Sequence, residues 1–258
     1  MPPTPSPTID PHSFAQGPAL PHLTLALAIN FASQTLAGSA TWQLATPPAE
    51  PTEVVFDTRD LVIERVWTNA EGTGPEAAHT LGTPDATLRQ ALRIALPAGT
   101  AAVRIAYRTS PHAAALRWLA PAQTAGEHPF LFTQSQAILA RTWLPCPDSP
   151  GRRFTYEAEV EILGEEKGQL LALMSAENPQ ATAPDGRYHF RQPRPTCWRW
   201  PRAASTLPRS AGAPESTPSP RPYPAPRTSS GSWTAWCKPP NNCMGSTAGS
   251  AMIYLCYQ

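Results

Sequence analysis

The chain has 258 residues, with 20 basic and 19 acidic side chains and a formal net charge of +1. A chain of this length can bury a substantial core, and its near-neutral charge gives no general indication of nucleic acid or a membrane surface as a partner. No run approaches the roughly 18 apolar residues of a membrane-spanning helix, and the proline-rich start lacks the pattern of a secretory signal. We therefore expect a cytoplasmic protein that binds neither nucleic acid nor membrane.

Residues 1–20 are rich in Pro and Ser and are expected to form a flexible arm. From residue 21 on, short stretches with alternating or uninterrupted apolar side chains are separated by turn residues about every dozen positions. These stretches are residues 23–29, 36–44, 54–56, 61–63, 92–96, 103–107 and 154–162. Alternation with a period of two indicates strands that bury one face. The sequence therefore predicts an all-β domain over residues 21–194, with a turn at residues 57–60.

The composition changes near Pro193. Residues 195–258 contain 11 of the 33 prolines, four of the eight tryptophans and four of the five cysteines, with little apolar periodicity. Disordered segments are poor in Trp and Cys, whereas folded domains are poorer in Pro, so the composition suits neither class. We expect this tail to be disordered and to stay off the β domain, because ordering it costs about 1–2 kcal/mol of backbone entropy per residue.

Side chains that could carry catalysis are scattered along the chain. The histidines show no HExxH spacing, and the tail cysteines form no Cys-x-x-Cys pair with a nearby His. The one cysteine of the body, Cys146, has no base beside it in the sequence, which favours a buried structural thiol over a nucleophile. The sequence therefore predicts no catalytic residue, no metal ligand and no cofactor in this chain. The six histidines are His12, His22, His79, His112, His128 and His189.

One segment, residues 128–156, is more distinctive than the rest. It contains Gln134 and Gln136 on either side of the small Ser135. On a strand, residues two apart lie on one face, and burying two amides without partners is costly. We therefore expect Gln134 and Gln136 to present amide donors and acceptors to a ligand, most simply a peptide backbone. The alternative is a plain strand pair closed by a proline-rich loop.

The same segment resembles a known family. Its HPFLFTQ, QAI, AR, LPCPD and TY stretches are similar to the signature of the leukotriene A-4 hydrolase branch of the zinc aminopeptidases. Further motifs similar to that family occur in the same order, and the resemblance covers about residues 10–194. They are Asp10-Pro11-His12-Ser13, Phe56-Asp57-Thr58-Arg59-Asp60-Leu61, Tyr107-Arg108-Thr109-Ser110-Pro111, Leu116-Arg117-Trp118-Leu119 with Gln123-Thr124, and Leu173-Met174-Ser175-Ala176.

The resemblance implies the saddle-like, mixed β N-terminal domain of these enzymes, which packs on a thermolysin-like zinc domain and lines its active-site cleft. It implies that Gln134, Gln136 and Ala137 contact the N-terminal part of a peptide substrate. Gln136 stands where the wider family often has a Glu that pairs with the substrate amine, and Leu139 stands where the family usually has His. The family's zinc ligands, general base and oxyanion tyrosine belong to a domain without a counterpart in this chain. We therefore expect the chain to be an inactive part of a zinc aminopeptidase.

Two other functions stay open on the residues alone. The β domain could be a non-catalytic binding module that uses residues 195–258 as a tail. The tail cysteines leave a disulfide- or zinc-stabilised interaction domain as a third class. The DNA downstream of this chain distinguishes the first two, because a catalytic domain encoded there in another frame would indicate an incomplete aminopeptidase.

The tail has the composition of GC-rich coding DNA read in the wrong frame. Joining the third base of each codon to the first two bases of the next makes residues 196–201 encode Leu/Val/Met-Leu-Ala-Leu/Val/Met-Ala, if Arg199 uses a CGN codon. This string is similar to the YLLALAxG that the family shows after QPxP, here Gln192-Pro193-Arg194-Pro195. The same phase near the C-terminus allows a reading similar to the stretch before the family's GGMEN loop and HExxH helix. We therefore predict an insertion or deletion of one or two bases between about codons 187 and 196.

Overall fold

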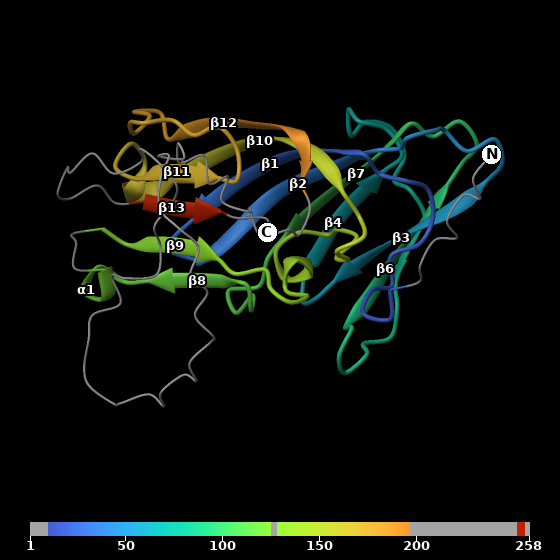
Figure 1. The fold of residues 1–258 in the computed structure, drawn as a ribbon, viewed down its shortest axis with the longest axis horizontal. Coiled ribbons are helices and arrows are strands. Elements are labelled where there is room, and N and C mark those ends of the chain that lie inside the picture. Colours follow the sequence, from blue (N-terminus) through green and yellow to red (C-terminus); the bar gives the residue numbers. More distant parts are fainter. Residues whose placement is uncertain (1–9, 125–127, 197–251, 256–258) are drawn as a thin grey trace, which may run out of the picture. The chain divides into compact units, whose positions relative to one another are not determined.

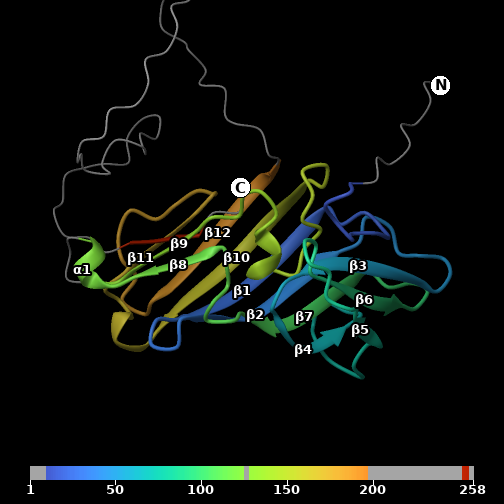
Figure 2. The same ribbon diagram turned by 90° about the horizontal axis from the view of Figure 1, so that it is seen from below.

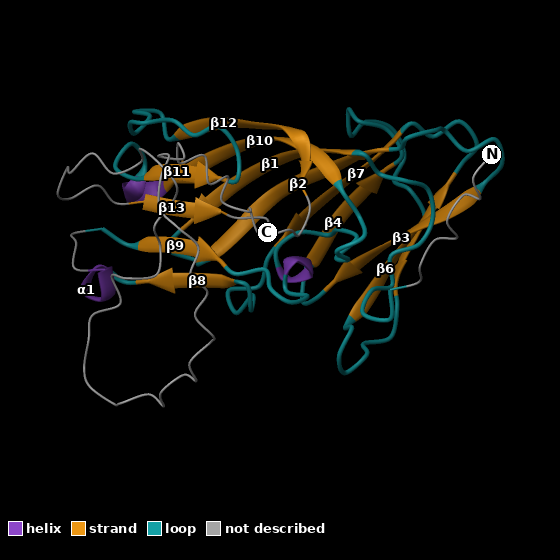
Figure 3. Ribbon diagram, viewed as in Figure 1, coloured by secondary structure: helices purple, strands orange, loops and turns teal. Residues whose placement is uncertain are grey.

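The computed structural model describes residues 10–124, 128–196 and 252–255, and within these the regular secondary structure is almost entirely β (Figure 3). The strands are β1 (His22–Asn30), β2 (Thr35–Gln43), β3 (Thr52–Thr58), β4 (Val62–Trp67), β5 (His79–Leu81), β6 (Gln90–Leu96), β7 (Ala102–Arg108), β8 (Leu116–Leu119), β9 (Phe130–Thr133), β10 (Phe154–Leu163), β11 (Leu171–Met174), β12 (Arg187–Thr196) and β13 (Met252–Leu255). Short helical turns lie at α1 (Pro121–Thr124), Ala140–Thr142 and Gly164–Glu166. The predicted all-β class is confirmed.

The strands form three sheets (Figure 1). The six-stranded sheet has the order β12-β10-β1-β2-β7-β4, in which β1 and β10 are parallel and the other neighbours are antiparallel. The four-stranded sheet has the order β11-β13-β9-β8 and is also mixed. The three-stranded sheet, β3-β6-β5, is antiparallel throughout. Mixed sheets are therefore present, as the family resemblance implies.

The alternation in the sequence corresponds to the buried faces of the strands. In β1 every second side chain from Leu23 to Ile29 is buried, and β10 repeats this pattern from Phe154 to Ile162. β1 and β10 lie side by side in parallel register, with Leu25 opposite Ala158 and Leu27 opposite Val160. The apolar faces of neighbouring strands therefore fall on the same side of the sheet, because side chains on a pleated strand alternate between its two faces.

Trp42 links several parts of the core. Its ring is fully buried on β2, meets Phe154 of β10 edge-on at 4.8 Å between centroids, and lies 5.9 Å from Phe56 of β3. Its indole Nε1 donates to the carbonyl of Pro145 at 3.0 Å. A buried indole N–H needs such an acceptor, so this side chain ties the loop around Pro145 to the six-stranded and three-stranded sheets.

The N-terminal segment differs from the expected flexible arm over residues 1–20. From Asp10 on it is anchored, because Ser149 Oγ donates to the Asp10 carboxylate at 2.5 Å and Gln16 pairs with Val55 by two backbone hydrogen bonds. Proline content suggested a loose chain, but a side chain of a distant loop and the backbone of β3 hold this segment in place. Residues 1–9 lie outside the described part of the chain.

The described ends of the tail also differ from the expectation that residues 195–258 stay off the domain. β12 continues through Thr196, two residues past the predicted boundary. Residues 252–255 form β13, which pairs with β11 on one side and β9 on the other. The apolar sequence of these four residues suits a strand, which the average composition of the tail concealed. Residues 197–251 and 256–258 lie outside the described residues.

Candidate functional site

Gln134, Gln136 and Ala137 lie immediately after β9, in a turn that follows the strand and not on the strand itself. All three are exposed, while Ser135 between the two glutamines is buried. Gln134 Nε2 donates to Gln136 Oε1 at 3.4 Å, so the two amides lie on the same side of the chain. The peptide bond between Gln136 and Ala137 is cis. The structure therefore brings together the three residues that the sequence singled out.

The backbone beneath these side chains is held from inside the protein. The Gln134 N–H donates to the carbonyl of Ala115 at 2.8 Å, and the Leu139 N–H donates to the carbonyl of Ser135 at 2.8 Å. The hydroxyl of Ser135 accepts a hydrogen bond from Nε1 of the fully buried Trp143 at 3.2 Å. A rigid backbone with outward-pointing amides is preorganised for binding, since less conformational entropy is lost when a ligand arrives.

Leu139 occupies the position at which the resemblance expects His. Its side chain is half-buried and packs against the core. Its carbonyl accepts a 2.7 Å hydrogen bond from Thr142 Oγ1, and Thr142 Oγ1 in turn accepts from the Ala115 N–H at 3.1 Å. Main-chain groups and a threonine therefore supply the local hydrogen bonding at this turn.

The other half of the segment is a buried charge network around Arg141. This guanidinium is fully buried, and its Nε donates to the Asp148 carboxylate at 2.9 Å. Its terminal nitrogens donate to the carbonyls of Leu88 at 3.0 Å and His12 at 2.8 Å, and one lies 3.6 Å from the Asp57 carboxylate. A buried ion pair is tolerated when further hydrogen bonds satisfy its remaining donors. Arg141 thus joins four segments that are far apart in sequence.

Asp57 is the second centre of this network. Its carboxylate accepts hydrogen bonds from the Ser13 hydroxyl at 2.5 Å, the Phe14 N–H at 2.7 Å and the Asp148 N–H at 2.9 Å. Burial raises the pKa of Asp57, and Arg141 together with these donors opposes that shift. The predicted turn at residues 57–60 therefore begins later, because Asp57 is a buried residue of β3.

The sequence reading did not identify the roles of Arg141, Asp57 and Asp148. All three lie inside the motifs on which the family resemblance rests. The indication of their role was therefore a charged residue within an otherwise apolar motif. A buried charge needs a partner, but sequence spacing does not indicate which segment provides it.

Cys146 is a core residue, as the sequence favoured. It is fully buried, and its backbone exchanges two hydrogen bonds with Asp57, at 2.9 and 3.4 Å. Burial raises the pKa of the nearby Tyr107 hydroxyl, and the Cys146 thiol adds to that rise. The Tyr107 hydroxyl therefore stays protonated in the core, because burial disfavours the charged form.

The histidines do not converge on a common site. His22 is hydrogen-bonded to Thr155 Oγ1 at 2.7 Å and His79 to the carbonyl of Ala77 at 3.0 Å, on different sheets. Within residues 10–124, 128–196 and 252–255, no group of three His, Cys, Asp or Glu side chains could hold a metal ion. The described residues therefore do not fit the zinc that the family resemblance implies.

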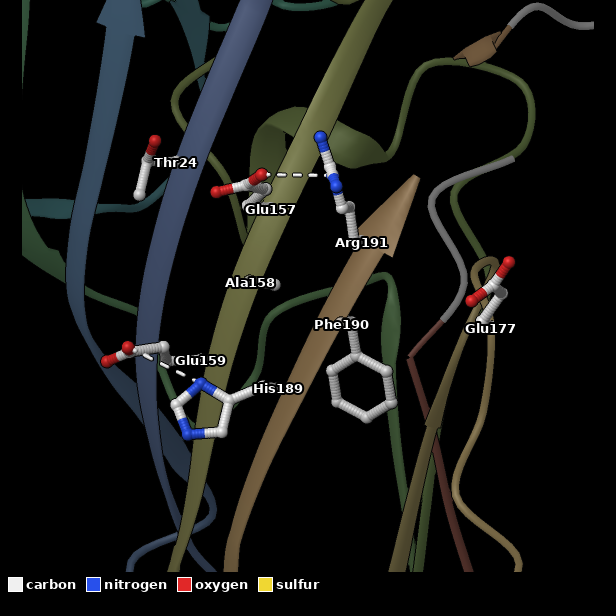
Figure 4. A pocket seen from close by; sticks show the side chains of 8 residues that line it. All are labelled: Thr24, Glu157, Ala158, Glu159, Glu177, His189, Phe190 and Arg191. Atoms are coloured by element: carbon white, nitrogen blue, oxygen red, sulfur yellow. Dashed lines mark ion pairs between the residues drawn. The ribbon is translucent and has the colours of Figure 1, made fainter. Parts of the chain in front are cut away.

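A hollow on the six-stranded sheet is lined by charged side chains of β10 and β12 (Figure 4). Glu157 pairs with Arg191 at 3.2 Å and Glu159 with His189 at 3.4 Å, each directly across the two strands. These side chains are largely exposed and already paired with each other, which is typical of a solvated sheet face. This hollow carries no candidate chemistry.

No helix among the described residues is long and apolar enough to span a bilayer.

Comparison with known proteins adds independent information. The profile of the family described as Peptidase M1 N-terminal domain matches residues 19–196. The chain is 37% identical over 175 residues to a leukotriene A-4 hydrolase of Xenopus laevis, which covers 65% of this chain and 27% of the relative. It is 33% identical over 198 residues to leucine aminopeptidase 2-2 of Scheffersomyces stipitis, covering 75% of this chain and 29% of the relative.

A solved structure agrees with these sequence matches. The structure of yeast LTA4 hydrolase in complex with Bestatin matches 75% of this chain and 29% of its own, with a TM-score of 0.63 at 28% identity. The match therefore covers less than a third of the length of each of these three proteins.

Proposed function

Because this chain belongs to the Peptidase M1 N-terminal domain family, we propose that it is the substrate-cleft β domain of a zinc aminopeptidase similar to leukotriene A-4 hydrolase. In this proposal Gln134, Gln136 and Ala137 contact the N-terminal part of a peptide substrate. The observation that supports it is the pair of exposed amides on a backbone anchored through buried Ser135.

Two neutral amides suit the first residues of a peptide. Each amide has two N–H donors and one carbonyl acceptor, and the bond between Gln134 and Gln136 uses one donor of the first and one acceptor site of the second. The pair therefore keeps donors for substrate carbonyls and acceptor sites for the substrate α-ammonium. A neutral amide cannot form the ion pair that a carboxylate would form with the ammonium. The site therefore does not require a charged ligand and is compatible with an uncharged one such as a lipid epoxide.

We further propose that this chain alone binds but does not hydrolyse. Zinc hydrolysis requires about three protein ligands, an open position for water and a base beside it. The 258-residue sequence contains no HExxH. The zinc ligands of the intact protein are proposed to be encoded in the alternative frame, of which residues 195–258 are the misread beginning.

Binding by the glutamines can be tested by nuclear magnetic resonance with tri-alanine as the probe. We expect the side-chain amide signals of Gln134 and Gln136 to shift on titration, while that of Gln43, an exposed glutamine at the end of β2, stays in place. The double variant Gln134→Ala/Gln136→Ala should abolish the response of the neighbouring Ala137 signal, and Gln43→Ala should not. Shifts of equal size at Gln43 would indicate non-specific binding.

Absence of catalysis is tested separately. Metal analysis of the pure chain should show far less than one tightly bound zinc, and an aminoacyl anilide should not be hydrolysed. Resequencing of the locus should show the base insertion or deletion, with GGMEN and HExxH encoded downstream. A locus without the shift and without those motifs contradicts the proposed frame change.

A second candidate, a non-catalytic β binding module, is favoured by one observation. Residues 252–255 pair with two strands of the domain, which a tail belonging to the protein would explain directly. The resequencing above distinguishes the two candidates. For either one we propose a cytoplasmic location, on the ground that residues 1–194 contain a single cysteine, as is usual in a reducing compartment.

A further inference from the structure

β13 occupies a central position in the four-stranded sheet. It runs parallel to β11 on one side and parallel to β9 on the other, as Figure 1 shows. In Figure 2 the same strand, drawn in red, again lies beside β9 and β11. Met252 to Leu255 pair with Leu171 to Met174 in unbroken register. Without this strand, the sheet would consist of a β8–β9 hairpin and a separate β11. A lone hairpin is marginally stable in water.

The register places the two faces of the added strand in different surroundings. Position 253 lies between Ala172 and Leu131, which are both fully buried. Position 254 lies between Leu173 and Phe132, which are both half-exposed. A segment added here must therefore be apolar at position 253, and it must have backbone N–H groups free to pair with neighbours on both sides.

We propose that the space between β9 and β11 is a strand-addition site for an extended apolar segment. In this chain residues 252–255 fill it, and by pairing with β9 they fix the turn that carries Gln134 and Gln136. β9 ends at Thr133, directly before Gln134, so order in β9 is transmitted to the first glutamine through one peptide bond. Only the consequence for substrate contacts rests on the proposed function; the strand addition itself does not.

The sequence of the tail explains why this segment is the occupant. Residues 250–258 are the longest stretch after Thr196 without Pro, Gly or a charged side chain. Proline cannot occupy a central strand, because it has no N–H for the ladder. Ile253 supplies a β-branched apolar residue at the position between Ala172 and Leu131, where such residues are favoured.

Hydrogen–deuterium exchange on the full chain tests the assignment. In Ile253→Pro, we expect amide exchange in residues 131–133 and 172–174 to accelerate about tenfold or more. The reason is that β9 and β11 can then open locally without breaking hydrogen bonds to β13. Exchange in β1 and β10 should stay unchanged. The matched control Thr247→Pro places the same residue before the strand and should leave all four regions as in the parent chain, and Ile253→Val should keep the protection.

Three outcomes would overturn the proposal. They are unchanged exchange in β9 and β11 of Ile253→Pro, acceleration that is equal in β1 and β10, and protection that rises with protein concentration. The last would show that a second copy supplies the strand. Amide exchange does not depend on a peptide ligand. Loss of protection in Ile253→Pro, together with no response of the parent chain to tri-alanine, would therefore remove the glutamine proposal and leave the strand-addition site intact.

Discussion

The segment from Gln134 to Asp148 has two halves that treat polar side chains in opposite ways. At one end, the amides of Gln134 and Gln136 are exposed and bonded to each other at 3.4 Å. At the other end, Arg141 and Asp148 are buried, joined at 2.9 Å and surrounded by backbone acceptors and donors. One half leaves its hydrogen-bonding groups exposed, where we propose that they meet a ligand, whereas the other half uses them within the protein.

This difference separates exposed polar groups, which we propose act in binding, from buried ones that stabilise the fold. Buried side chains whose hydrogen bonds are all made hold the loop in one arrangement. That arrangement determines where the exposed amides lie. The motif is therefore informative as a whole, although its charged residues stabilise the domain and only its amides face outward.

The largest effect is expected for Arg141→Met. The change removes the cation that pairs with Asp57 and Asp148 and leaves two carboxylates buried, which should lower the free energy of unfolding by about 3–5 kcal/mol. Urea denaturation measures this quantity. Arg93→Met is the matched control, because Arg93 pairs with Glu53 at 2.7 Å while both side chains are nearly half-exposed, and it should cost less than about 1 kcal/mol. Equal losses for the two variants would contradict the assigned role.

Ser135→Ala should have an intermediate effect. It deletes the buried hydroxyl that accepts a hydrogen bond from Trp143 Nε1 at 3.2 Å, at an expected cost of about 1–2 kcal/mol. The control is Ser33→Ala, which removes a hydroxyl from an exposed turn where it lies 2.7 Å from Thr35 Oγ1. Thermal unfolding of both variants under identical conditions gives the comparison, and a silent Ser135→Ala would mean that the backbone under the glutamines is held by other contacts.

Asp10→Asn should change how stability depends on acid. Burial opposes the shift, but hydrogen bonds from Ser149 Oγ and the His12 N–H lower the pKa of Asp10 below its ordinary value of 3.8. A carboxylate with a lowered pKa in the folded state contributes stability above pH 4, approximately, and loses that contribution as the pH falls through the folded pKa. The parent chain should therefore lose more stability between about pH 5 and pH 3 than Asp10→Asn does. Parallel curves would show that the Asp10 anchor contributes nothing.

The smallest effect on stability is expected for Gln134→Ala and Gln136→Ala. Both side chains are exposed, so the free energy of unfolding should change by no more than about 0.5 kcal/mol. The same variants should lose the response to tri-alanine, which separates a role in binding from a role in folding. A loss of stability comparable to that of Ser135→Ala would assign the amides to the structure of the loop.

The sequence by itself determined the class of the domain and its family. Strands β1 and β10 were predictable because alternation with a period of two is a local property of a half-buried strand. The prominence of residues 134–137 was also predictable, since neighbouring glutamines within an apolar motif are uncommon unless they have partners. The profile match over residues 19–196 confirms the family that the ordered motifs resemble.

Only the tertiary structure decided which distant groups satisfy each other. Arg141 meets Asp57, His12 and Leu88 across three other segments, and this network anchors residues that composition alone suggested were loose. Likewise, residues 252–255 join β9 and β11. A buried charge and an unpaired strand edge both require a partner, but their energetics specify only its chemistry, while its position along the chain depends on how the whole domain folds.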